Sequence, residues 1–148
     1  MDLILWRHAE AEDGMPDLER KLTPRGHKQA ARMARWLSAQ LPERFRLLSS
    51  PAARARQTAT ALGTRMQVDE RLAPGGNARD LLAACGWGGD GETVVVVGHQ
   101  PTLGRVAALA LTGRETDWRL RKGAICWLSQ GPRPGAILKA LIPPDMLP

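Results

Sequence analysis

One unbroken apolar run, Thr93-Val94-Val95-Val96-Val97, constrains the fold of this chain more than any other segment. Its side chains are mostly β-branched, and they do not alternate with polar residues as they would in a strand with one face in water. Such a run is typical of a central parallel strand that is covered on both faces. We therefore expect residues 93–97 to lie at the centre of an α/β sheet.

Apolar strands and amphipathic helices alternate along the rest of the chain. We expect further strands at residues 2–7, 45–48, 66–68, 124–129 and 136–142, the last two joined by a hairpin-like loop over 131–135. We expect helices at about residues 24–40, 51–62, 77–85 and 101–112. This order predicts a three-layer α/β/α sandwich with a mainly parallel sheet and an antiparallel edge.

Two of these helices share a start signal. Thr23 precedes Pro24 and Ser50 precedes Pro51, so that each pair places an N-cap residue before a proline at the first helical position. The helix at 24–40 also has apolar residues at helical spacing, which predicts one buried face: Ala30, Met33, Ala34, Leu37 and Leu41.

Length and charge narrow the class of protein. A chain of 148 residues favours one domain, which we expect to span residues 1–148. The net charge of +6 favours an anionic substrate or an acidic partner. Nucleic acid would suit this charge, but the arginines are scattered, and one Phe with no Tyr offers little base stacking.

Cysteines and the N-terminus give two further expectations. Cys85 and Cys126 lie among apolar residues, which favours buried free thiols over a disulfide or a metal site. The apolar residues 1–6 are followed at once by Arg7 and His8 and are too short for a signal peptide. No apolar stretch approaches the ~20 residues that span a bilayer, so we expect a cytoplasmic protein.

Two histidines follow two of the predicted strands. His8 comes directly after residues 2–7, and His99 comes after 93–97 and one glycine. In parallel α/β sheets the ligand crevice lies at the carboxyl ends of the strands, so both imidazoles should face one crevice. The helix after Ser50 should begin at the same edge with Arg54 in its first turns, and Arg7 lies beside His8. Arginines, histidines and a helix N-terminus together predict a phosphate site.

Histidine adds a chemical role to that site. A neutral imidazole, with an ordinary pKa near ~6.5, is a good nucleophile at neutral pH. It can accept a phosphoryl group and release it to water, while arginines neutralise the charge on the transferred group.

Four motifs then point to a family. Arg7-His8-Ala9 resembles RHG, the segment from Ser50 to Thr58 matches SPxxRAxQT, Val97-Gly98-His99 matches a histidine after a valine-rich strand, and Leu22-Thr23-Pro24-Arg25-Gly26 matches LTxxG. In this order they resemble the histidine phosphatase superfamily of phosphoglycerate mutase-like fold. The small size resembles the SixA branch, which acts on phosphohistidine in phosphorelay or phosphotransfer proteins.

The resemblance implies roles for particular residues. His8 would be the nucleophile, and Arg7, Arg54 and His99 would form the phosphate pocket. Arg20 would match an additional phosphate-contacting arginine of the SixA branch, and Ser50 of the second motif would contact substrate. No metal or organic cofactor is implied, and the implied partner is a phosphohistidine protein.

Two departures from the family pattern bear on the chemistry. Ala9 stands where the family has glycine, which matters only if this position needs a positive φ. Larger members also carry an acidic residue that protonates the leaving group, and none stands out here among Glu10, Glu12, Asp13, Glu70 and Asp80. Phosphohistidine leaves as imidazole and needs far less protonation than an alkoxide, so the missing acid favours a phosphohistidine substrate.

Two other functions stay open at this point: a phosphatase for small phosphate monoesters, and a catalytically silent module that binds phosphate or a phosphoprotein. Among the other polar residues, we interpret His27 as packed against the apolar face of its helix, and Arg25, Arg32 and Arg56 as solvated. Trp6, Trp36 and Trp127 are expected in the core, whereas Trp87 and Trp118 lie in loops that could border the crevice.

Overall fold

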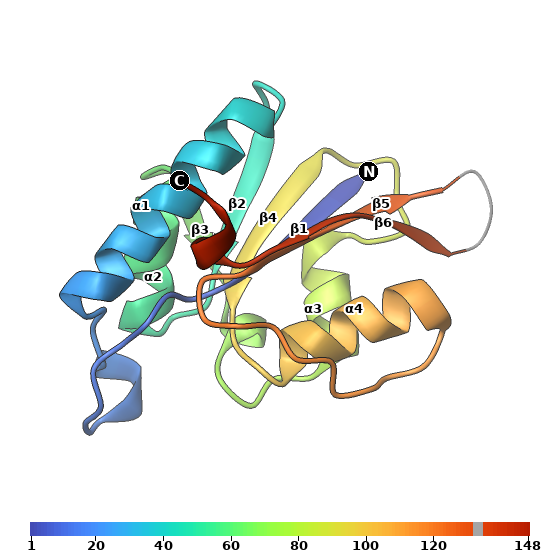
Figure 1. Ribbon diagram of the computed structural model, residues 1–148. Coiled ribbons are helices and arrows are strands. Elements are labelled where there is room, and N and C mark those ends of the chain that lie inside the picture. The colour runs from blue at the N-terminus through green and yellow to red at the C-terminus, as the bar shows by residue number, and fades with distance from the viewer. Residues whose placement is uncertain (132–134) are drawn as a thin grey trace.

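The computed structural model describes residues 1–131 and 135–148 and has the predicted α/β architecture (Figure 1). Its strands are β1 (Asp2–Arg7), β2 (Phe45–Ser49), β3 (Met66–Val68), β4 (Thr93–Gly98), β5 (Ile125–Gln130) and β6 (Ala136–Ile142). Its α-helices are α1 (Pro24–Gln40), α2 (Ala53–Thr60), α3 (Ala78–Cys85) and α4 (Thr102–Thr112). The described residues also include three short 3₁₀ helices, which the sequence did not predict: η1 (Asp17–Glu19), η2 (Glu70–Leu72) and η3 (Pro144–Met146).

The six strands of the described residues form one sheet in the order β3-β2-β4-β1-β5-β6. β3, β2, β4 and β1 are parallel to one another, whereas β5 pairs antiparallel with β1 and β6 pairs antiparallel with β5. The predicted mainly parallel sheet with an antiparallel edge is therefore confirmed. The predicted loop at 131–135 includes residues 132–134, which lie outside the described residues.

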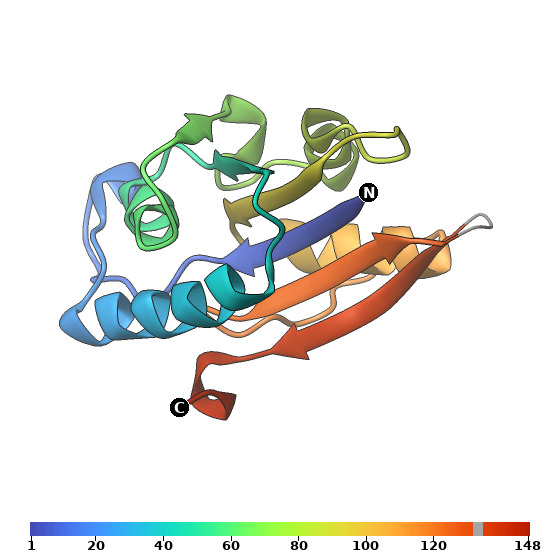
Figure 2. The ribbon, with the colours of Figure 1, turned by 90° about the horizontal axis from the view of Figure 1, so that it is seen from above.

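Helices cover both faces of the sheet (Figures 1 and 2). Ile4, Trp6 and Val95 pack on the side of α1 and α2, while Leu3 and Val96 pack on the side of α3 and α4. The valines of β4 at positions 94–97 are at most 1% exposed, as expected for the central strand. Burying one such side chain contributes on the order of 1.5–3 kcal/mol to the stability of the fold. The helices on the two faces therefore fix the position of the sheet and of its carboxyl edge.

The two helix starts differ from each other. At α1 the prediction is confirmed, because Thr23 Oγ1 accepts a hydrogen bond from Gly26 N at 2.9 Å. At α2 the predicted start at Pro51 is wrong, since the helix begins at Ala53. Ser50 Oγ instead accepts from Ala52 N at 3.1 Å, which holds the chain in a turn before the helix begins.

Several side-chain interpretations can now be compared with the structure. His27 is exposed, so the prediction that it packs on the apolar face of α1 is wrong; Gly26 and Ala30 occupy that face. Cys85 and Cys126 are buried free thiols, as predicted. Trp6 and Trp127 are core residues, whereas Trp118 is 39% exposed. Within the described residues, no helix is long and apolar enough to cross a membrane.

Candidate active site

The fold brings His8 and His99 together at the carboxyl edge of the sheet. β1 and β4 are adjacent and parallel, with Arg7 opposite Gly98 in the register. The histidines that follow these strands have ring centroids 5.1 Å apart, with planes inclined by 52°. Their exposed fractions are 7% for His8 and 4% for His99, so the two imidazoles form a largely dehydrated pair.

Each imidazole has a hydrogen-bond partner that fixes its orientation. His8 Nδ1 lies 2.8 Å from the carbonyl oxygen of Ala9. A carbonyl can only accept, so Nδ1 carries the proton and Nε2 keeps its lone pair. His99 Nε2 lies 2.7 Å from Ser50 Oγ, which is fully buried. The free Nε2 of His8 is therefore the nitrogen available for nucleophilic attack.

Ala9 fits its position without strain. Within the described residues, positive φ angles occur only at glycines, so this site does not need the family's glycine. The fully buried Ala9 donates its N–H to Thr58 Oγ1 at 3.0 Å, and this hydroxyl donates to the carbonyl of Arg54 at 2.8 Å. Thr58 thus connects the segment after His8 to α2, a role that the motif alone did not reveal.

Two guanidinium groups line the site with part of their donors unused. Arg7 Nη1 donates to the carbonyl of Leu120 at 2.7 Å, and Arg54, which is 4% exposed, donates from Nη1 to the carbonyl of Asp17 at 2.8 Å. The Nε atoms of Arg7 and Arg54 are buried and have no hydrogen-bond partner among the described residues. A buried N–H without a partner is costly, and a tetrahedral oxyanion is the group that guanidinium donors bind best.

Asp17 organises two of the arginines, and the sequence analysis missed it. Its carboxylate accepts from Arg54 Nη2 at 3.1 Å and from Arg20 Nη1 at 3.1 Å. Arg20 is further held by its bond from Nε to the carbonyl of Glu12 at 2.7 Å. No motif marks Asp17, since the contact to Arg54 depends on how η1 folds against α2.

The electrostatics of the site keep both histidines neutral. Burial lowers the pKa of His8 to about 4, and the charges of Arg54, Arg7 and Arg20 add to this effect. Burial likewise lowers the pKa of His99 to about 3, with contributions from His8 and Arg54. At neutral pH the site therefore presents two uncharged imidazoles and nearby guanidinium cations.

The carboxyl groups considered as general acids from the sequence are either bonded to other side chains or exposed. Glu10 accepts from Thr23 Oγ1 at 2.7 Å, and Asp80 accepts from Asn77 Nδ2 at 2.8 Å. Glu12, Asp13 and Glu70 are exposed. The hydrogen bond from Arg20 lowers the pKa of Asp17, which is consequently ionised and a poor proton donor. Among the described residues, no carboxyl is hydrogen-bonded to His8 or His99.

The fold is α/β, with two buried histidines and two guanidinium groups near one edge of the sheet, and comparison with known proteins identifies the family of the chain. Residues 3–75 match the family model described as the histidine phosphatase superfamily (branch 1). An uncharacterized protein of Mycobacterium tuberculosis is 36% identical over 118 residues, covering 75% of this chain and 73% of the relative. An uncharacterized protein of Picosynechococcus is 37% identical, covering 88% of this chain and 86% of the relative.

Solved structures agree with this result. The protein histidine phosphatase SixA complexed with tungstate matches with a TM-score of 0.82 and 27% identity, covering 99% of both chains. A putative phosphohistidine phosphatase SixA from Nakamurella multipartitia matches with a TM-score of 0.78 and 29% identity, covering 95% of this chain and 94% of the other. The chain belongs to the histidine phosphatase superfamily, branch 1, whose members are generally phosphatases that act on phosphate-bearing substrates.

Proposed function

We propose that this protein is a phosphohistidine phosphatase that works through a phospho-His8 intermediate and acts on a phosphorelay or phosphotransfer protein in signal transduction. The observation that carries the proposal is the state of His8. Its imidazole is neutral, its Nδ1 is bonded to the Ala9 carbonyl, and its Nε2 is free beside arginines with unused donors. A neutral imidazole with a free ring nitrogen can act as a nucleophile and accept a phosphoryl group.

In the first step, His8 Nε2 attacks phosphorus in line with the bond to the leaving group. A new N–P bond forms at Nε2 as the N–P bond of the substrate phosphohistidine breaks. The substrate imidazole keeps the electron pair and takes a proton from solvent. Arg7, Arg54 and Arg20 are assigned to neutralising the phosphoryl oxygens during the transfer, where charge stabilisation dominates catalysis.

In the second step, water attacks phospho-His8. The water oxygen bonds to phosphorus, Nε2 recovers its electron pair, and the water protons leave with hydrogen phosphate and solvent. His99, positioned by Ser50, is assigned to a hydrogen bond with the phosphoryl group. The structural match to SixA, solved with the tetrahedral oxyanion tungstate, supports an oxyanion in this pocket.

The carboxyl groups favour phosphohistidine over a phosphate monoester. An alkoxide leaving group needs a proton in the transition state, and a positioned general acid contributes about 10²–10⁴-fold. The carboxyl that contacts the arginines, Asp17, is held ionised. Imidazole is a far weaker base than an alkoxide and leaves without such a donor.

A substrate panel tests this proposal. We expect wild-type protein to hydrolyse a histidine-phosphorylated phosphotransfer protein with a kcat/KM at least about 100-fold above that for phosphoserine, whose leaving group is an alkoxide. His8→Ala serves as the control for contaminating phosphatases. Faster hydrolysis of phosphoserine would favour a small-ester phosphatase, and turnover of neither substrate would favour a binding module.

A further inference from the structure

A basic cleft lies next to the phosphate pocket. It has a volume of about 490 Å³ and is lined by five cationic side chains, Arg7, Arg25, Arg119, Arg121 and Lys122, which define the basic cleft below. Arg7 belongs to both sites, because it is the last residue of β1, directly before His8, and also lines the cleft. The cleft therefore adjoins the proposed phosphate site at Arg7.

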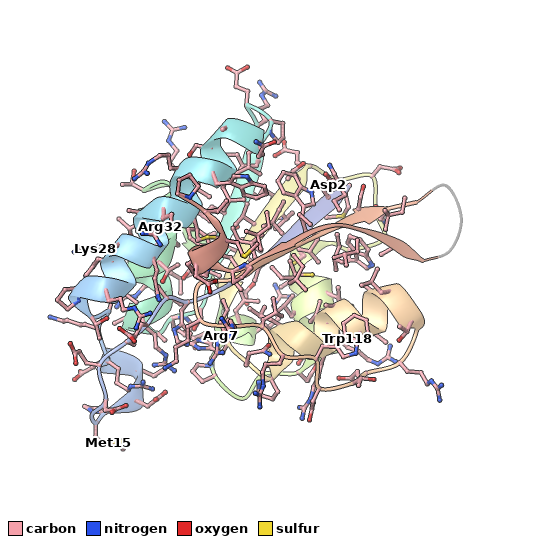
Figure 3. All side chains as sticks on the ribbon, viewed as in Figure 1. Asp2, Arg7, Met15, Lys28, Arg32 and Trp118 are labelled. Carbon is pink, nitrogen blue, oxygen red and sulfur yellow. The ribbon has the colours of Figure 1, made fainter. Side chains whose placement is uncertain are left out.

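Four segments distant in sequence line the cleft, with Arg7 at the end of β1 and Glu10 after it, Arg25 and Gln29 on α1, residues 119–122 before β5, and Pro144 and Asp145 at η3. The segment between α4 and β5 returns to the carboxyl edge of the sheet, where Leu120 accepts from Arg7 and Gly123 N donates to the His8 carbonyl at 3.0 Å. η3 at the C-terminus lies beside α1 and is held by a 3.4 Å hydrogen bond from Arg32 Nη1 to the Pro144 carbonyl. Figures 1 and 2 show both segments toward the end of the sheet to which β1 points, with η3 beyond β6, and Figure 3 labels Arg7 and Arg32.

The positive charge of the cleft is only partly neutralised within the protein. Two acidic side chains, Glu10 and Asp145, also line it. Asp145 lies 3.3 Å from Arg121, and Glu10 lies 3.9 Å from Arg25. Arg119 and Lys122 are exposed and form no ion pair with any residue that the structure describes. Two cations beside the phosphate pocket are thus free to bind an external anion.

We propose that the basic cleft binds an acidic segment of the phosphoprotein that flanks the phosphorylated histidine. This inference rests on the proposed function, because it assigns the substrate's surroundings to the same site. The cationic side chains are long and mostly exposed, with Arg25 77% and Arg121 72% accessible, which suits steering and transient recognition. No aromatic side chain lines the cleft, so it offers no stacking platform for nucleic-acid bases.

Two peptides that differ only in charge test the inference. Each carries one phosphohistidine, flanked on both sides by glutamates in one peptide and by glutamines in the other. We expect wild-type protein at low ionic strength to prefer the acidic peptide by about tenfold in kcat/KM. The Arg119→Gln/Lys122→Gln variant should reduce this ratio to near one, and high salt should reduce the wild-type ratio as well.

A matched control removes the same charge elsewhere. Arg44 and Arg65 are exposed and precede β2 and β3, at the opposite edge of the sheet. The Arg44→Gln/Arg65→Gln variant should keep the wild-type preference. An equal loss in both variants would show a general charge effect and would overturn the inference. A wild-type ratio of one would also overturn it, while the proposed activity would stand.

A binding measurement separates the cleft from the chemistry. Fluorescence anisotropy with the unphosphorylated glutamate peptide should show weaker binding for the Arg119→Gln/Lys122→Gln variant than for the control variant. If wild type hydrolyses neither peptide, the proposed function fails. Weaker peptide binding by the Arg119→Gln/Lys122→Gln variant than by the control variant would then still show that the basic cleft binds an acidic segment. Equal binding by all variants, or complete displacement of the peptide by an equimolar DNA oligonucleotide, would overturn it.

Discussion

Burial and neighbouring charge set the protonation of His8 and His99. Both rings are buried, and the positive charges of Arg54 and Arg7 act on both, so burial and charge together disfavour the charged imidazolium. The hydrogen bond to the Ala9 carbonyl acts in the opposite direction but is outweighed. The neutral state that a nucleophile requires is therefore a consequence of where the fold places these residues.

This protonation state predicts how stability depends on pH. The pKa values of His8 and His99, about 4 and about 3 in the folded protein, lie below the ordinary value of 6.5. Between about pH 4 and 6.5 the unfolded chain consequently binds more protons, so the free energy of unfolding should fall as the pH drops through this window. Urea denaturation of wild type and His99→Gln isolates the effect, because the variant should show a shallower dependence.

NMR titration measures the protonation of the two histidine rings directly. The ring signals of both histidines should stay unchanged from pH 8 to 5. A midpoint near 6.5 for either ring would contradict the account.

Thr58 makes a second prediction at the scale of single residues. Thr58→Val keeps the shape of the side chain but leaves the buried Ala9 N–H without its partner. We expect a loss of about 1–3 kcal/mol in unfolding free energy by chemical denaturation, together with reduced activity as His8 loses its support. Thr58→Ser retains the hydroxyl and should be much closer to wild type; equal losses in both variants would show that the methyl group matters instead.

For single residues, the sequence predicted which side chains come together at the sheet edge. It did not predict the contacts that fix their positions. His8, His99, Arg7 and Arg54 come together because strand ends and a helix start are readable from apolar runs and helix signals. Asp17 was not predictable, since its contact with Arg54 joins positions 37 apart through an exposed segment without periodicity.

At the scale of elements, close approaches between backbones decide which helices and loops can meet. A Cβ built on Gly104 of α4 would collide with the carbonyl oxygen of Trp118. Gln100 also bridges these segments, since its Nε2 donates to the Trp118 carbonyl at 2.8 Å and its Oε1 accepts from Gly104 N at 2.7 Å. The segment that carries Arg119 and Leu120 is thereby held on α4.

We therefore expect Gly104→Ala to destabilise the protein by about 3 kcal/mol or more, since backbone atoms would have to move. Gly63→Ala is the control, because a Cβ there meets nothing within 4 Å and φ is not positive. Its effect on the unfolding free energy should stay within about 1 kcal/mol. Similar unfolding midpoints for the two variants would contradict the close approach of Gly104 to the Trp118 carbonyl.

Element positions were predictable wherever periodicity or β-branched runs marked them, as in α1 and β4. The start of α2 was not, because the proline signal at Ser50-Pro51 competes with the local turn in which Ser50 accepts from Ala52. The 3₁₀ helices were also missed, since three residues are too few for a period to be visible.

At the scale of the whole molecule, the sheet order explains how one edge collects the site. β4 and β1 are adjacent and parallel at the centre, so the residues that follow them converge (Figure 2). The basic cleft could not be predicted, because it combines η3 with a segment that has neither helical nor strand periodicity.

The charge of the assembled site predicts independence from metal ions. The guanidinium groups of Arg7 and Arg54 beside two imidazoles would repel a divalent cation. We expect exhaustive dialysis against EDTA to leave phosphohistidine hydrolysis unchanged. Loss of activity that zinc or magnesium restores would contradict this expectation.

Trapping the covalent intermediate tests the central claim most directly. Wild-type protein is mixed with a ³²P-labelled phosphohistidine protein, quenched with alkali within milliseconds and mapped by mass spectrometry. The account predicts a transient, acid-labile phosphate on His8 that His8→Ala does not form and that decays at the rate of phosphate release. Steady turnover by wild type with no label on His8, or with label on another residue, would contradict it.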